Sequence, residues 1–286
     1  MYLKSFNLAS ENMEYDLLVD FSNRRLYDSL YPFRIFTNKK LERLSFENIT
    51  IFYGNNGSGK STLLNIVAET LGAVRKTEID KGDCFYAYVK VCKYDMAREK
   101  PLEIKIVTSD DIFDYLLDIR SINAKVNRTR ETLSSEYLKY KSDNGHVEFN
   151  DYETLKKKSD AKNKTMASYI RERLSKNIAE QSNGESALMF WEKEINENSL
   201  YILDEPENSL SAENQLKLKK FIEESVRFFG CQFIISTHSP FLLGLTEAKI
   251  YDLDTVPVCV KDWTKLENVK IYHDFFKENE SSFNSN

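Results

Sequence analysis

Residues 49–62 read ITIFYGNNGSGKST, and this stretch decides the fold. Its first five residues are apolar, aromatic or β-branched and predict a buried strand, and the apolar spacing that follows predicts a helix over 60–71. Three of the chain's nine glycines lie between them, where backbone N–H groups and a helix N-terminus form a cradle for an anion. The pattern G-x-x-x-x-G-K-[ST] of a phosphate-binding loop is matched by Gly54, Gly59, Lys60 and Ser61.

This loop predicts that the chain binds ATP together with Mg²⁺. Lys60 is expected to reach the β- and γ-phosphates, and Ser61 is expected to give its hydroxyl to the ion. The nucleotide-binding residues predicted in the loop are Gly54, Asn55, Asn56, Gly57, Ser58, Gly59, Lys60, Ser61 and Thr62.

Two further apolar strands are predicted to end in chemically active side chains. The stretch LYILDEP places Asp204 and Glu205 at the carboxyl end of a strand, where open α/β sheets bind their ligands. Asp204 suits the Mg²⁺ shell, and Glu205 is placed to orient and polarise an attacking water. His238 follows FIIS and can sense a phosphate oxygen, or it can simply cap a helix. His146 and His273 have no such context and are expected at the surface.

The composition is that of an ordinary globular chain. The 286 residues are 41% hydrophobic, which suffices for one large core. No stretch approaches the roughly 20 apolar residues of a membrane helix, and the start lacks the order of a signal peptide, so we expect a cytoplasmic protein without membrane insertion. The cysteines lack the paired short spacing of metal sites, which predicts reduced, structural thiols at Cys84, Cys92, Cys231 and Cys259.

The order of patterns predicts an α/β fold with a mainly parallel central sheet, an N-terminal antiparallel β part and an inserted helical lobe. In the N-terminal part, strands are expected within 16–22, 31–36, 42–54, 84–91 and 102–108. We expect a single domain over 1–286, in which 1–108 hold the β part and the phosphate loop, 109–180 the lobe, and 181–286 the remaining motifs and a C-terminal cap.

Positive charge is concentrated in the predicted lobe. Residues 120–180 carry fourteen Lys or Arg and nine Asp or Glu, whereas the chain as a whole has a net charge of −5. A basic face over 120–176 is one way to contact DNA, and a solvated helical face is the alternative. The lysine-rich run at 156–164 holds no aromatic residue on which bases would stack.

Residues 181–186 read QSNGES, and taken alone they predict a helix N-cap. In the order GNNGSGKST, QSNGES, LYILDEP and STHSP, the four motifs resemble those of the ATP-binding-cassette ATPases. The resemblance implies a P-loop ATPase whose signature residues Ser182, Gly184 and Glu185 bind the ATP held by a second subunit, so that a homodimer closes over the nucleotide. Within the class, the residues of these motifs look most similar to those of the SMC, RecF and OLD ATPases and of phage-defence ATPases.

The chain departs from the transporter pattern in two places. No glutamine occurs between Ser61 and Gln181, so Ser109 or Asp110 would stand in for the glutamine that links nucleotide and lobe in transporters. Ser211 stands where the class has an aspartate after the second acidic motif. These departures disfavour transporter-type coupling.

Three functions are therefore weighed. The favoured one is an ATP-driven switch that acts on DNA or on a partner effector, with any nuclease or toxin on a separate chain. A transporter's nucleotide-binding subunit is the first alternative and a small-molecule kinase the second. The sequence does not identify the residues that contact adenine. Tyr31, Phe33 and Phe36 either stack on the base or belong to the core, and the core interpretation is favoured.

Overall fold

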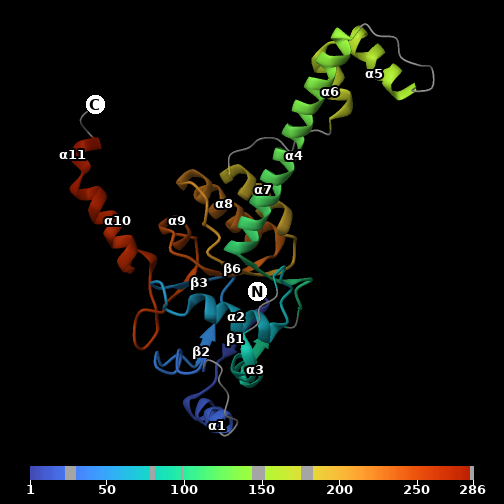
Figure 1. Ribbon diagram of the computed structural model, residues 1–286. Helices are drawn as coiled ribbons and strands as arrows, with labels where there is room; N and C mark the ends of the chain where they lie inside the picture. The colour runs from blue at the N-terminus through green and yellow to red at the C-terminus, as the bar shows by residue number, and fades with distance from the viewer. Residues whose placement is uncertain (23–29, 78–80, 98, 144–151, 175–182, 284–286) are drawn as a thin grey trace. The chain divides into compact units, whose positions relative to one another are not determined.

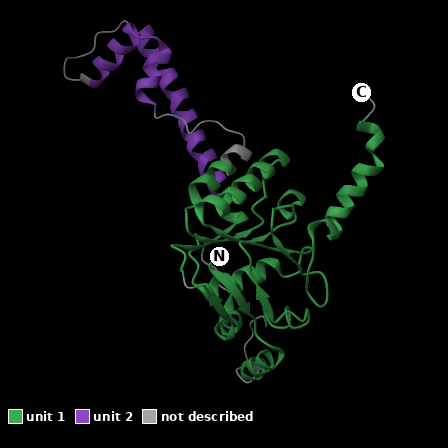
Figure 2. Cartoon of the chain, turned by 180° about the vertical axis from the view of Figure 1, so that it is seen from behind, with its two compact units in different colours: residues 1–112, 183–286 green, residues 113–182 purple. Residues whose placement is uncertain are grey.

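The computed structural model describes residues 1–22, 30–77, 81–97, 99–143, 152–174 and 183–283. The chain divides into two compact units, Met1–Ile112 with Asn183–Asn286, and Phe113–Ser182 (Figure 2). The first unit contains both sheets and every described residue of the predicted nucleotide site. The second unit is helical.

The main sheet of the first unit has the strand order β5-β6-β7-β3-β8-β9, and all neighbours are parallel except β8 and β9 (Figure 1). Every residue of the central strands β3 and β7 is buried, as expected for strands covered on both faces. The strands are β3 (Ile49–Tyr53), β5 (Ile104–Thr108), β6 (Leu200–Asp204), β7 (Gln232–Ser236), β8 (Lys249–Asp252) and β9 (Cys259–Val260).

A separate antiparallel sheet has the order β2-β1-β4, formed by β1 (Leu3–Asn7), β2 (Arg43–Ser45) and β4 (Lys93–Met96). The buried side chain of Gln232 ties it to the main sheet. Its Oε1 accepts hydrogen bonds from the N–H groups of Tyr2 (2.7 Å) and Leu3 (2.8 Å), and its Nε2 donates to the carbonyl oxygens of Leu3 and Glu47.

Helices cover both faces of the main sheet: α2 lies on one face, with α3 packed against it, and α8 lies on the other, with α7 and α9 packed against it (Figure 1). α2 ends where Gly72 adopts a left-handed conformation, as its predicted C-cap requires. The helices of this unit are α1 (Glu11–Ser22), α2 (Lys60–Leu71), α3 (Gly82–Val91), α7 (Asn183–Glu194), α8 (Ala212–Phe229), α9 (Pro240–Leu243), η1 (Trp263–Lys265), α10 (Glu267–Glu278) and α11 (Glu280–Phe283).

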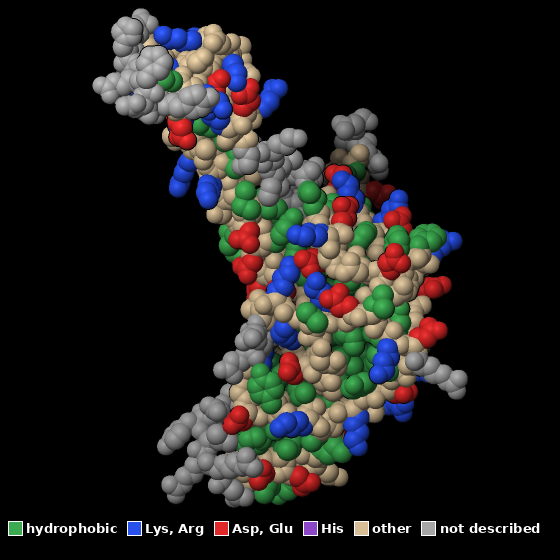
Figure 3. Space-filling model, turned by 90° about the vertical axis from the view of Figure 1, so that its right-hand side faces the viewer, with side chains coloured by type: hydrophobic (Ala, Val, Ile, Leu, Met, Phe, Trp, Pro, Cys, Tyr) green, Lys and Arg blue, Asp and Glu red, His purple; other side chains and the backbone are tan. Residues whose placement is uncertain are grey.

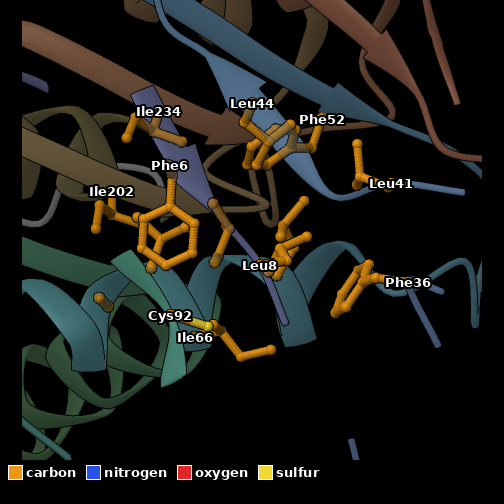
Figure 4. Close-up of a cluster of buried hydrophobic side chains, with 14 of the residues drawn as sticks. Phe6, Leu8, Phe36, Leu41, Leu44, Phe52, Ile66, Cys92, Ile202 and Ile234 are labelled. Carbon is orange, nitrogen blue, oxygen red and sulfur yellow. The ribbon is translucent and has the colours of Figure 1, made fainter. Parts of the chain in front are cut away.

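The core fills the space between the two sheets and α2. Phe6 of β1 lies near Ile202 of β6 and Ile234 of β7 (Figure 4), while the ring of Phe36 lies next to Gly59, the residue before α2. Cys92 belongs to the same cluster as a buried free thiol. This core fixes the main sheet and the phosphate loop relative to one another.

The helical unit is built from α5 (Tyr152–Asn163), α6 (Met166–Arg173) and most of α4 (Ser109–Ser142). It has a small core of its own around Tyr137, Ala161 and Tyr169. None of the helices in the described part of the chain is both long and apolar enough to span a membrane.

Three expected strands are absent. Residues 16–22 belong to α1 and residues 84–91 to α3, while residues 31–36 form turns. In 84–91 the core contacts come from Cys84, Phe85 and Tyr88, a spacing of one helical turn that its aromatic, β-branched composition obscured. The predicted strands at 102–108 and after residue 199 are confirmed, whereas residues 42–54 form two short strands, β2 and β3, that belong to different sheets.

Candidate active site

The phosphate loop connects β3 to α2 in a conformation that only glycine fits at two positions. A Cβ on Gly54 would lie 2.6 Å from Oγ of Ser58. Gly59 has a φ of +98°, and a Cβ there would lie 3.1 Å from Ile35. The structure thus explains the first and last glycines of the motif by close approach and by left-handed backbone.

Lys60 is buried beneath this loop. Its Nζ donates hydrogen bonds to the carbonyl oxygens of Gly54 (2.8 Å) and Asn55 (3.2 Å). Burial lowers the pKa of Lys60, and the nearby carboxylates, Glu205 foremost, oppose that shift. The ammonium is thus at the loop, within the field of acidic side chains from other strands.

Asp204 lies at the carboxyl end of β6, in register with Ser236 of β7. Its Oδ1 accepts hydrogen bonds from Oγ of Ser61 at 3.1 Å and from Oγ of Ser236. Burial raises the pKa of the Asp204 carboxyl, and these hydroxyls lower it in part. The structure brings together Ser61 and Asp204, the two predicted Mg²⁺ ligands. Such oxygen donors fit this hard cation.

Glu205 and His238 face each other beside Asp204. Oε1 of Glu205 lies 3.6 Å from Nε2 of His238, and Oε2 accepts a hydrogen bond from Nδ2 of Asn208 at 3.1 Å. Among the described residues, no partner hydrogen-bonds the buried Nε2 of His238. Burial, followed by the charge of Lys60, lowers the pKa of His238. A neutral imidazole therefore stands next to the carboxylate at pH 7.

Two acidic residues of the site were not predicted. Oε1 of Glu207 accepts hydrogen bonds from Oγ1 of Thr237 (2.6 Å) and from the N–H groups of His238 (2.8 Å) and Ser239 (3.1 Å). Both carboxylate oxygens of Asp254 accept from the N–H of Asn55, at 3.0 and 2.8 Å. An acidic residue shortly after an apolar strand is the sequence signal that both share.

The signature segment is described only in part. Gly184 and Glu185 lie in the first turn of α7, whereas Ser182 lies outside the described residues. Ser109 and Asp110 begin α4 immediately after β5, whose last residue, Thr108, pairs with Asp204.

The aromatic cluster ahead of the loop is divided between two environments. Phe33 and Phe36 are buried, as the core interpretation predicted. Tyr31 stacks on Phe85 with the ring centroids 6.1 Å apart. Its hydroxyl donates to Oγ1 of Thr62 at 2.9 Å, so this tyrosine touches the phosphate loop's last predicted residue.

Several cations of the lobe pair with carboxylates of the lobe itself. Nζ of Lys157 forms a salt bridge with Oε1 of Glu136 at 2.9 Å, and Nζ of Lys158 forms one with Oδ2 of Asp143 at 2.7 Å. The other pairs join Lys164 to Asp160 and Glu172, and Arg173 to Asp160. In the face shown in Figure 3, Lys and Arg side chains are mixed with Asp and Glu rather than gathered into a region of one sign.

Comparison with known proteins places these motifs in a family. The family model for ABC transporters matches residues 42–208, more than half of the chain, and the model for an AAA ATPase domain matches residues 185–243. No curated protein matches the chain.

Several solved structures match the chain over most of its length. The SMC head domain of Thermotoga maritima has a TM-score of 0.42 at 15% identity, over 92% of this chain and 99% of that one. An ABC transporter of metal-chelate type, in an inward-facing conformation, has a TM-score of 0.41 at 16% identity, over 96% of this chain and 90% of that one. An Smc head bound to the C-terminal winged-helix domain of ScpA has a TM-score of 0.39 at 19% identity, over 77% and 93%.

Proposed function

Because this chain belongs to the ABC transporter family, whose model matches residues 42–208, we propose that it is an ATPase that closes as a homodimer on ATP and switches a partner effector or DNA. One observation carries the proposal. Ser61, Asp204, Glu205 and His238 come from two separate strand ends and one helix start, yet they meet around the loop that holds Lys60. A cation at the phosphates, oxygen ligands for Mg²⁺ and a residue that orients water are recurring parts of phosphoryl-transfer sites.

Each side chain has a distinct task in the proposed reaction. Lys60 leaves the carbonyl oxygens of the loop and neutralises the β- and γ-phosphates, while Ser61 and Asp204 hold Mg²⁺. The ion supplies positive charge where negative charge accumulates on the phosphate oxygens. Glu205 orients the attacking water, and neutral His238 donates a hydrogen bond to the γ-phosphate.

The dimer is proposed from the signature segment. Ser182, Gly184 and Glu185 precede or begin α7, and a helix N-terminus with free N–H groups attracts a phosphate. We propose that α7 of one subunit covers the ATP bound by the other, so that nucleotide binding and dimer closure are a single event. An isologous pair would contain two such sites.

The partner is proposed to be an effector on a separate chain, a nuclease or a toxin, in the cytoplasm. DNA contact through residues 120–176 is the weaker version, because several of these cations are already paired. A transporter subunit would use the same ATP site. The chain, however, has no glutamine between Ser61 and Gln181 that could link the bound nucleotide to the lobe as it does in transporters.

Glu205→Gln tests the proposal. The amide cannot polarise water as the carboxylate does, so phosphate release should fall by about 100-fold or more, whereas ATP affinity should persist and a dimer should accumulate. Colorimetric phosphate release and size-exclusion light scattering, with and without ATP, measure both. Glu131→Gln makes the same change on the exposed surface of α4 and should behave as wild type. Full hydrolysis by monomeric Glu205→Gln would refute both the catalytic role and the closed dimer.

A further inference from the structure

We infer that Glu207 is a positioning residue for hydrolysis, which holds the backbone around His238 so that the imidazole faces Glu205. The inference rests on the proposed function and adds to it a residue that the four motifs do not include. Among the described residues, no hydrogen bond joins Glu207 to either of the predicted Mg²⁺ ligands, Ser61 and Asp204. Its effect would pass through His238.

The hydrogen bonds of Glu207 converge on one short segment. A single oxygen, Oε1, accepts three hydrogen bonds. The donors are Oγ1 of Thr237 at 2.6 Å, the N–H of His238 at 2.8 Å and the N–H of Ser239 at 3.1 Å. These three hydrogen bonds, from consecutive residues, fix both the position and the orientation of the peptide that carries the imidazole.

The same peptide is held from its other side. The carbonyl oxygen of His238 accepts a hydrogen bond from Nδ2 of Asn268 at 2.8 Å, and the N–H of Asn268 donates to the hydroxyl of Tyr53 on β3 at 3.1 Å. The backbone of His238 therefore has partners at both its N–H and its C=O. In the imidazole, by contrast, Nε2 has no hydrogen-bond partner among the described residues and faces Oε1 of Glu205.

Glu207 also couples the histidine to the catalytic carboxylate. It follows Glu205 with only Pro206 between them, and Glu205 has a φ of 49°, which few residue types other than glycine adopt readily. One stiff segment thus carries the carboxylate that orients water and the carboxylate that holds the histidine. A misplacement of about 1 Å between reacting groups can lower a rate by about 100-fold.

A purely structural role predicts something different. Burial raises the pKa of Glu207, while its hydrogen bonds with the 237–239 segment oppose the shift. If Glu207 only stabilised the fold, its removal would change the stability of the protein and leave the imidazole's environment and the chemical step alone.

The first test is a double-mutant cycle. Glu207→Ala should lower kcat by about 100-fold and leave ATP affinity within about threefold, and Glu207→Gln, which keeps an oxygen acceptor, should restore most of the rate. In a His238→Ala background, Glu207→Ala should have little further effect, because its action passes through the missing imidazole. Additive losses, a parallel loss of ATP affinity or a failure of Gln to rescue would overturn the inference.

The control and a second variant come from the same unit. Glu223 accepts hydrogen bonds from the N–H and the hydroxyl of Thr246, at 2.9 and 2.8 Å, which is a similar clamp away from the site. Glu223→Ala should leave kcat unchanged. If Glu207→Ala does not fold, Thr237→Val removes one of the three donors and should lower kcat by about fivefold, again only when His238 is present; an unchanged rate would count against the inference.

The second test does not depend on hydrolysis. The chain has three histidines, so nitrogen-15 NMR of histidine-labelled protein, with His238→Ala for assignment, follows the imidazole of His238 directly. Glu207→Ala should shift the titration of His238, because the imidazole would change its exposure and its distance to Glu205, and Glu223→Ala should not. An unchanged His238 titration would overturn the inference. A shifted titration in a protein that does not hydrolyse ATP would instead refute the proposed function and leave the positioning role standing.

Discussion

The carboxylates at the edge of the parallel sheet and those of the helical lobe are perturbed in opposite directions. At the sheet edge, burial raises the pKa of Asp204 and of Glu207. In the lobe, hydrogen bonds from Arg173 and Lys164 lower the pKa of Asp160. The sheet edge thus concentrates acidic groups whose charge is costly to bury, whereas the lobe pairs its acids with its own cations. Costly charges gathered in one place indicate a functional site.

Lys60→Ala should produce the largest effect, because it removes the cation that the acidic edge surrounds. ATP affinity should fall by at least about 100-fold, since the remaining carboxylates would then repel the phosphates. Isothermal titration calorimetry with ATP and Mg²⁺ measures the loss. Lys100→Ala, at an exposed lysine, should retain wild-type affinity. Normal binding by Lys60→Ala would show that the loop is not the phosphate site.

Asp204→Asn should weaken the apparent Mg²⁺ affinity by about 10- to 100-fold, because an amide is a poorer ligand for a hard cation. In the wild type, acidification should raise the Mg²⁺ concentration needed for half-maximal hydrolysis. Protons compete with the metal for a carboxyl whose pKa burial has raised, so the competition begins at a higher pH than for an ordinary aspartate.

Titrations of ATPase activity with Mg²⁺ at several pH values test this. The Asp204→Asn variant should lose the pH dependence along with the affinity, since an amide does not titrate in this range. A variant with unchanged Mg²⁺ dependence would remove Asp204 from the metal site.

The sequence predicted those elements in which local pattern and burial agree. β3, β6 and β7 are continuous apolar runs, and α2 ends at a glycine that caps it. α3 was mistaken for a strand because Phe85 and Tyr88 favour strands locally, and only their common packing against the core reveals the helical face.

The site was predictable to the same extent. Ser61, Asp204, Glu205 and His238 belong to motifs with fixed spacing, and the structure brings them together. Glu207 and Asp254 each follow an apolar strand, but they bind segments about 30 and 199 residues away in the chain, and that local signal does not say which segment each one binds. Likewise, counting lysines over 120–180 cannot show that Lys157 and Lys158 are neutralised by neighbours.

Glu14→Gln tests whether burial also dominates away from the nucleotide edge. Glu14 is 3% exposed, and its Oε2 accepts hydrogen bonds from the N–H of Arg34 and the hydroxyl of Thr37, both at 2.9 Å. Burial raises its pKa in the folded state. The stability that this group contributes is therefore full below the unfolded pKa of about 4.3 and is lost as pH rises through the folded pKa.

The glutamine keeps an oxygen acceptor but does not titrate. We expect Glu14→Gln to be more stable than wild type at pH 7 by no more than about 1 kcal/mol, with the advantage shrinking toward pH 4. Urea unfolding at a series of pH values measures the difference. Glu11→Gln, on the exposed side of α1, should show no such trend. The difference in free energy of unfolding between Glu14→Gln and wild type should be larger at pH 7 than at pH 4. A smaller difference at pH 7 would contradict the prediction.

Asp160→Asn should have the smallest effect on ATP hydrolysis, less than about twofold, because the ion pairs that Asp160 makes in the structure's described part are with Lys164 and Arg173 of the lobe. The lowered pKa of Asp160 gives the opposite sign to that of Glu14. Its contribution to stability is present above the unfolded pKa of about 3.9 and is lost as pH falls through the folded pKa.

The same variant sharpens the DNA question, because it releases Arg173 from its pair and leaves Lys164 with Glu172 alone. If the lobe contacts DNA, Asp160→Asn should bind a duplex up to about tenfold more tightly at about 50 mM salt, with the gain reduced at about 200 mM. Fluorescence anisotropy, with exposed Asp114→Asn as the control, measures it. If wild type and variant both fail to bind at low salt, with and without ATP, the lobe's cations serve its own packing, and a protein effector is left as the target of the switch.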